Sequence, residues 1–158
     1  MKYIESPEKY YTGKLSVFLA GGITNCPNWQ KEMVELLKDL DIVIYNPRRE
    51  NFPIEDPNAA YEQIKWEFET LDRVSTILFW FSRGSLNPIV LFEYGKWLMN
   101  LRNKENYKPI FVGIDPEYER KRDVEIQTQL ENNYIRSRFV YSLEDLAEQI
   151  ILTIKVNK

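Results

Sequence analysis

At residues 76–81 the chain reads TILFWF, and apart from Thr76 every position of this run is apolar. A run without alternation is typical of a central strand in a parallel sheet, because helices cover both of its faces and neither face meets water. We therefore expect 76–81 to be a central parallel strand. The chain on either side must then supply further strands and the helices that cover them.

Short β-rich runs and longer helical patterns alternate on both sides of this strand. Further strands are expected at residues 15–20, 42–45, 109–114 and 138–141. Helices are expected at residues 27–40, 59–74, 88–101, 123–133 and 142–155. This alternation predicts an α/β fold, a flavodoxin-like three-layer sandwich whose five-stranded parallel sheet has the order 2-1-3-4-5. One domain is expected over residues 1–158, with its core at about 15–155.

Two of the expected helices carry features that bear on a site. On helix 59–74, apolar residues at helical spacing predict a buried stripe, formed by Ala60, Ile64, Phe68 and Leu71. For helix 88–101, Asn87 is expected as the N-cap, and Pro88 suits the first helical position.

The composition excludes several classes of function. With a net charge of −3, the chain offers no electrostatic reason for a nucleic-acid or anionic-membrane partner. It has no histidine and only Cys26 as a thiol, which excludes serine–histidine and cysteine–histidine catalysis and leaves no usual set of zinc ligands. The first residues lack the apolar core of a signal peptide, and no run has the length of a membrane span, so a cytoplasmic protein is expected.

The run SVFLAGGIT at residues 16–24 ends an expected strand with a glycine pair, Gly21 and Gly22. In a sheet of this topology, ligands bind beyond the carboxyl ends of the strands, where the strand order reverses. The glycine pair and the turn at 82–87 both face that crevice. The pair lacks the GxGxxG pattern of a dinucleotide site. It forms either a tight turn or a place where the backbone approaches a ligand.

Two carboxylates, Glu93 and Glu67, stand in unusual surroundings. Glu93 lies near the start of helix 88–101 among Ile, Leu, Phe and Trp residues, where a buried charge is costly without a partner or a task. Glu67 lies at the edge of the apolar stripe on the preceding helix. From their spacing alone, both either form structural hydrogen bonds or carry out catalysis.

Four motifs in this order resemble the nucleoside 2-deoxyribosyltransferase superfamily, which also contains the 2′-deoxynucleoside 5′-monophosphate N-glycosidases. The motifs are FLAGGIT at 18–24, NPRR at 46–49, WEFETLDRVSTILFW at 66–80 and SLNPIVLFEYGKW at 85–97. The resemblance extends over residues 15 to 113, which is most of the chain.

The resemblance implies a role for each of the two carboxylates. Glu93, in FEYG, matches the glutamate that attacks C1′ of the deoxyribose and forms a covalent glycosyl-enzyme intermediate. Glu67 matches an acidic residue, usually aspartate, that manages protons on the nucleobase. This chemistry passes through an oxocarbenium-like state and needs no metal and no organic cofactor.

The resemblance also implies a set of residues that border the sugar and the base. These substrate-binding residues are Phe18, Gly21, Gly22, Pro47, Arg48, Asn51 and Asn87. Two of them depart from the family pattern: Phe18 stands where transferases often have tyrosine, and Asn87 stands where aspartate or serine is typical. Asn87 carries no charge, so the choice between a 5′-hydroxyl and a 5′-phosphate stays open, with the unphosphorylated nucleoside favoured.

The expected activity is therefore transfer of a deoxyribosyl group between nucleobases. Hydrolysis of the same bond, in a deoxynucleoside or its 5′-monophosphate, is the alternative, and a non-catalytic nucleotide-binding module is the third reading. The expected partners are a deoxynucleoside or deoxynucleotide, a free nucleobase and further copies of the chain in a homo-oligomer.

Overall fold

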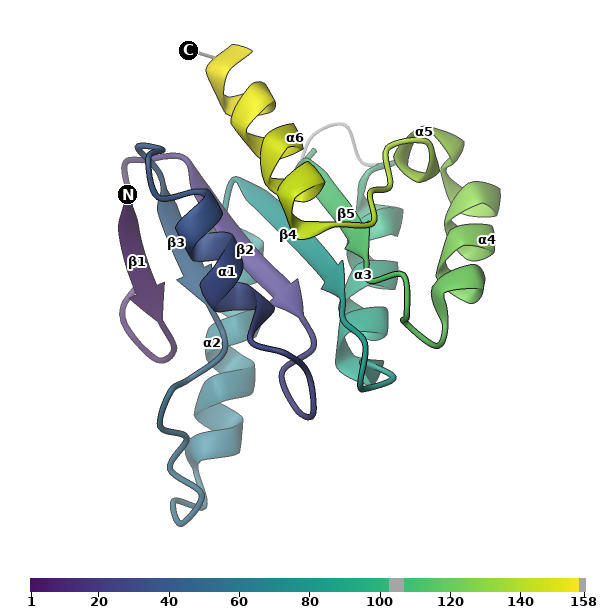
Figure 1. The fold of residues 1–158 in the computed structure, drawn as a ribbon. Helices are drawn as coiled ribbons and strands as arrows, with labels where there is room; N and C mark the ends of the chain where they lie inside the picture. The colour runs from purple at the N-terminus through teal and green to yellow at the C-terminus, as the bar shows by residue number, and fades with distance from the viewer. Residues whose placement is uncertain (103–106, 157–158) are drawn as a thin grey trace.

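The computed structural model describes residues 1–102 and 107–156. Within these residues the chain forms a five-stranded parallel sheet in the order β1-β3-β2-β4-β5 (Figure 1). The strands are β1 (Lys2–Glu5), β2 (Ser16–Gly21), β3 (Val43–Asn46), β4 (Thr76–Phe81) and β5 (Ile110–Ile114). The helices are α1 (Trp29–Leu36), α2 (Ala59–Arg73), α3 (Pro88–Asn100), α4 (Lys121–Glu131), α5 (Asn133–Arg136) and α6 (Leu143–Val156).

The predicted flavodoxin-like α/β fold is confirmed, with β4 in the interior of the sheet as the TILFWF run indicated. Helices α1 and α6 cover one face of the sheet, and α2 and α3 cover the other (Figure 1). Phe79 and Phe81 of β4 pack on the ring of Tyr94 from α3. Leu78 and Trp80 of β4 belong to the opposite core, which α1 and α6 complete. Both faces of β4 are therefore buried.

The fifth strand differs from the one expected at 138–141. That segment makes a single parallel bridge, between Val140 and Gly113, because α5 ends at Arg136, α6 begins at Leu143, and turns and bends occupy most of the residues between them. The sheet is completed at its other edge by β1, which pairs with β3 from Lys2↔Val43 to Glu5↔Asn46. Only Ile4 of β1 is fully buried, so its sequence lacks the apolar run that revealed the other strands.

The apolar stripe predicted for α2 is wrong for three of its four residues, because Ala60, Ile64 and Phe68 are exposed. Ile64 and Phe68 are 64% and 61% exposed, whereas Leu71 is buried as expected. The buried side of α2 is instead formed by Ala59, Thr70 and Leu71, so Ile64 and Phe68 lie on a neighbouring side that nothing covers among the described residues. The N-terminal part of α2 extends past the carboxyl edge of the sheet (Figure 1). Glu67 therefore lies where the strands end.

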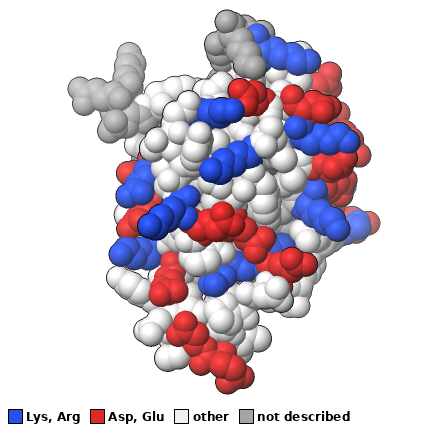
Figure 2. Space-filling view, turned by 90° about the vertical axis from the view of Figure 1, so that its left-hand side faces the viewer, with Lys and Arg blue, Asp and Glu red and all other residues white. Residues whose placement is uncertain are grey.

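The surface carries charges of both signs. On the face over the β1 edge, lysine and arginine side chains are interspersed with aspartate and glutamate (Figure 2). Intermingled charges of this kind produce no strong field of one sign on that face. Among the described residues, no helix combines the length and the apolar character that a membrane span requires.

Candidate active site

A cavity of about 370 Å³ opens at the carboxyl edge of the sheet, between the ends of β2 and β3 and the helices α2 and α3. Its lining contains seven of the nine residues that the sequence singled out: Phe18, Gly21, Gly22, Pro47, Glu67, Asn87 and Glu93. The lining also contains Ala20, Ile23, Thr24, Ser85, Pro88, Ile89 and Val90. Seven of the residues that the sequence singled out thus meet at the edge of the sheet where the topological rule expects a ligand.

The glycine pair at the end of β2 is required by close packing. A Cβ on Gly21 would lie 2.3 Å from the Trp29 ring, and a Cβ on Gly22 would lie 2.0 Å from Asn87 Oδ1. The carbonyl of Gly22 also accepts hydrogen bonds from the side chains of Trp29 and Gln30, at 3.0 and 3.2 Å. Because neither glycine has a side chain, Trp29 and Asn87 can pack directly against this stretch of backbone. The same stretch of backbone lines the cavity.

Glu93 and Glu67 approach the cavity from α3 and α2. Burial raises the pKa of the Glu93 carboxyl from its ordinary value of 4.5 to about 8, the nearby Glu67 charge adds to the rise, and Lys96 opposes it. Burial also raises the pKa of Glu67, and a hydrogen bond from Gln63 opposes that rise. Because the two carboxyls repel each other, they titrate as a pair, and the pair retains a proton at neutral pH.

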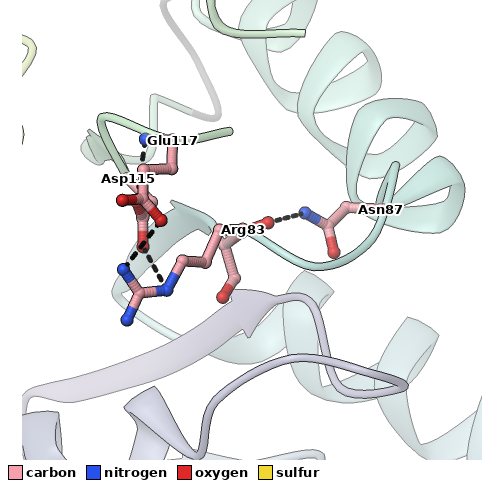
Figure 3. Close-up of polar contacts among 5 residues, drawn as sticks. Arg83, Asn87, Asp115 and Glu117 are labelled. Atoms are coloured by element: carbon pink, nitrogen blue, oxygen red, sulfur yellow. Dashed lines mark hydrogen bonds and ion pairs between the residues drawn. The ribbon is translucent and has the colours of Figure 1, made fainter. Parts of the chain in front are cut away.

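Asn87 occupies the N-cap position of α3, as expected, but its side chain forms no capping hydrogen bond. The residue has φ 51° and ψ 51° in the left-handed region, which Asn tolerates better than most residues. Its side chain turns inward and is 3% exposed. Nδ2 donates to the Ser82 carbonyl at 2.8 Å (Figure 3), and Oδ1 accepts from the Cys26 thiol at 3.4 Å.

Arg83, in the same turn, is held away from Asn87 by two acidic residues (Figure 3). Its Nη1 donates to Glu117 Oε2 at 3.0 Å, and its Nε lies 3.8 Å from Asp115 Oδ2. Both acids belong to the segment after β5. The guanidinium is therefore engaged and is not part of the cavity lining.

Two of the expected substrate-binding residues, Arg48 and Asn51, do not line the cavity. The Arg48 guanidinium donates to the carbonyls of Cys26 and Pro27 and to Gln30 Oε1, at 2.9 to 3.2 Å. It fastens the loop after β3 to the start of α1. Asn51 is exposed in the same loop.

Two residues that the sequence reading missed, Gln63 and Ser6, form a chain of hydrogen bonds to Glu67. Gln63 Nε2 donates to Glu67 Oε1 and to the Pro47 carbonyl, both at 2.7 Å. Ser6 Oγ donates to Gln63 Oε1 at 2.6 Å. The spacing of Gln63 and Glu67 by one helical turn was visible in the sequence. Ser6 lies 57 residues away from Gln63, and no sequence pattern indicated their contact.

The cavity can support acid and nucleophile chemistry by one carboxylate and one carboxylic acid. Within residues 1–102 and 107–156, no group of three or more His, Cys, Asp or Glu side chains is arranged to hold a metal ion.

Comparison with known families gives one finding. A family model described as "Nucleoside 2-deoxyribosyltransferase like" matches residues 14–107, which is more than half of the chain. The matched region contains both carboxyls, the glycine pair and Asn87. A search of curated proteins gave no match.

Proposed function

Because the chain belongs to the nucleoside 2-deoxyribosyltransferase-like family, we propose that it transfers the deoxyribosyl group of a 2′-deoxynucleoside from one nucleobase to another. The observation that carries this proposal is the convergence of Glu93 and Glu67 on one cavity, with a raised pKa for each carboxyl. Retaining glycosidic chemistry needs one carboxylate to attack and a second carboxyl group to donate a proton.

In the first step, a Glu93 carboxylate oxygen forms a bond with C1′ while the C1′–N bond breaks. The electron pair of the broken bond passes to the leaving nucleobase, which takes a proton from Glu67. In the second step, a nitrogen of the incoming base attacks C1′, the bond to Glu93 breaks, and the proton of that nitrogen passes to Glu67. Atoms and charges balance over the cycle, with no net consumption of a co-reactant.

The productive state of the pair has the charge on Glu93 and the proton on Glu67. In the free protein, burial first and the charge of Glu67 second raise the pKa of Glu93, so the pair holds one proton at neutral pH. Lys96 favours the charged form of Glu93, and developing positive charge at C1′ favours it further in the transition state. The proton then remains on Glu67, beside the leaving base.

An unphosphorylated nucleoside suits this cavity better than its 5′-monophosphate. A phosphate dianion needs hydrogen-bond donors and preferably an arginine. The Asn87 amide group donates to Ser82, and Arg83 is engaged with Asp115 and Glu117. Oδ1 of Asn87, an acceptor, can take a hydrogen bond from a 5′-hydroxyl, which a dianion cannot offer.

The mouth of the cavity continues into an exposed apolar surface, the α2–α3 face. Its residues are Tyr61, Ile64, Phe68, Ile89 and Phe92, each more than 60% exposed. Ile89 also lines the cavity, and Lys96 of α3 lies 4.5 Å from the centre of the Phe68 ring on α2. Large exposed apolar patches mark interaction sites. We place the contact of a homo-oligomer on this face, where a second copy would close the cavity.

The proposed activity is tested by incubating the protein with a deoxynucleoside and a different free nucleobase and separating the products by chromatography. We expect a new deoxynucleoside from the wild type and from Glu62→Gln, an exposed control on α2, and none from Glu93→Gln, because an amide cannot attack C1′. Release of free deoxyribose without exchange would identify the hydrolase instead.

Two further outcomes would overturn parts of the proposal. A strong preference for the 5′-monophosphate that is lost in Arg83→Ala would contradict the choice of an unphosphorylated substrate. No turnover of either substrate, together with thermal stabilisation by a nucleotide, would identify a binding module.

A further inference from the structure

The Gln63 side chain joins three parts of the chain that lie far apart in the sequence. It stands on α2, one helical turn before Glu67. Its amide nitrogen donates to Glu67 Oε1 and to the Pro47 carbonyl in the loop after β3. Its amide oxygen accepts from Ser6, directly after β1. Both N–H donors of the amide and one lone pair of its oxygen therefore have partners.

The chemistry of these partners sets which way the amide faces. The Pro47 carbonyl is an acceptor only, and so is the ionised Glu67 carboxylate, so the NH₂ group must face both of them. The Ser6 hydroxyl can donate to the oxygen on the other side. A flipped amide would place its oxygen against two acceptors and lose both hydrogen bonds. The geometry thus admits one orientation.

Ser6 is itself held rigidly. It is 4% exposed, and its backbone N–H donates to the Asn46 carbonyl at 3.2 Å, which continues the ladder between β1 and β3. Asn46 immediately precedes Pro47, the other partner of Gln63. The edge strand β1 is thereby linked through Ser6 and Gln63 to a carboxyl in the cavity.

The contacts make the two oxygens of Glu67 unequal. Among the described residues, Gln63 is the side chain that donates a hydrogen bond to this carboxylate, and it does so to Oε1. A carboxyl oxygen whose lone pair accepts an amide N–H cannot carry a proton on that same lone pair. The proton of the acid form is therefore expected on Oε2.

We propose that Gln63 is a positioning residue, which holds Glu67 Oε1 as an acceptor and leaves Oε2 to carry the proton for the nucleobase, and that Ser6 helps to hold the Gln63 amide in place. This inference rests on the proposed function, because it assigns the proton of Glu67 to a leaving base. It gives the N-terminal segment a part in catalysis although that segment does not line the cavity.

The first test measures base exchange across pH in Gln63→Met, which keeps the length of the side chain and removes the amide. Glu62→Gln, an exposed neighbour on the same helix, is the control. We expect Gln63→Met to lower kcat about tenfold or more while KM changes less than about threefold, because proton delivery and not binding is impaired. We expect Ser6→Ala to act in the same direction and more weakly, because the Gln63 amide oxygen loses a partner and the amide is held less firmly, while the Pro47 carbonyl still fixes its orientation.

The second test does not depend on turnover. It follows the Glu67 carboxyl by ¹³C NMR in protein labelled at glutamate, with Glu67→Gln to assign the signal. Loss of the Gln63 hydrogen bond removes a group that favours the charged form, so the pKa of Glu67 should rise by about one pH unit in Gln63→Met. Thermal unfolding of each variant checks that the fold is retained.

The two tests separate the two ideas. An unchanged kcat and an unchanged Glu67 titration in Gln63→Met would overturn the positioning role while leaving the proposed function standing. If the wild type catalyses no exchange and no hydrolysis, the proposed function fails, and the role of Gln63 in proton delivery fails with it. If Gln63→Met still shifts the pKa of Glu67 in that case, only the electrostatic effect of Gln63 on Glu67 would stand.

Discussion

Replacement of Glu93 by glutamine should make the protein more stable at alkaline pH. The folded state holds the proton of Glu93 up to a pKa of about 8, whereas the unfolded chain loses it at the ordinary value of 4.5. Between these two values the folded state binds more protons, so the free energy of unfolding falls as the pH rises and the loss is complete above about pH 8. Glutamine has nearly the same shape and cannot ionise.

The size of the effect follows from the same two values. A rise from 4.5 to about 8, at about 1.4 kcal/mol for each pH unit, corresponds to at most about 5 kcal/mol. We therefore expect Glu93→Gln to lie within about 1 kcal/mol of the wild type at about pH 5 and to exceed its stability by about 3–5 kcal/mol at about pH 9.

Urea unfolding of both proteins at the two pH values measures this difference. Glu62→Gln provides the matched control, since an exposed carboxyl on α2 should change the free energy of unfolding by less than about 0.5 kcal/mol at either pH. If Glu93→Gln differs from the wild type by the same amount at both pH values, Glu93 is not held in the buried, repulsive surroundings that its proposed role requires.

The other predictions concern the glycine pair, the carboxyl pair and the α2–α3 face. Gly22→Ala places a Cβ 2.0 Å from Asn87 Oδ1 and 2.5 Å from Cys26 Sγ, so thermal unfolding should show a loss of about 1–3 kcal/mol. Gly95→Ala, whose Cβ meets nothing within 4 Å in α3, should instead gain about 0.5–1 kcal/mol, and equal effects of the two changes would refute the packing argument. For base exchange, kcat/KM should fall about tenfold per pH unit above about pH 8, where the carboxyl pair loses its last proton, and a rate that stays level to about pH 10 would contradict acid catalysis by this pair. Phe92→Asp should dissociate the oligomer in sedimentation velocity, because it places a charge in the proposed contact. An unchanged sedimentation coefficient would remove the α2–α3 face as that contact.

The strands and helices that were predicted correctly are those with a continuous apolar run or a periodic apolar pattern. The TILFWF run could only be buried on both faces, and the structure has it as β4 in the interior of the sheet. The same logic predicted β2, β3 and β5 to within one or two residues. Edge strand β1 was not predicted, because only one of its faces meets the core and Ile4 is its single fully buried residue.

The candidate site was predictable in part. The motifs around Gly22, Glu67 and Glu93 lie on separate elements, and the strand order brings those elements to one edge of the sheet. The exposure of Ile64 and Phe68 was not predictable, because helical periodicity reports which residues share a face and not what covers that face. The homo-oligomer contact that we propose on this face would account for their apolar character.

The amino-acid sequence by itself determined the order and type of the main elements, since both depend on local periodicity and on the need to bury apolar faces. It also contained the motifs that place the chain in its family. Only the tertiary structure decided what the polar side chains do. Arg48 fastens a loop, Asn87 turns inward instead of capping its helix, and Ser6 reaches Gln63 across 57 residues. Such contacts depend on distances of a few ångströms between elements that are remote in the chain, and no local pattern encodes them.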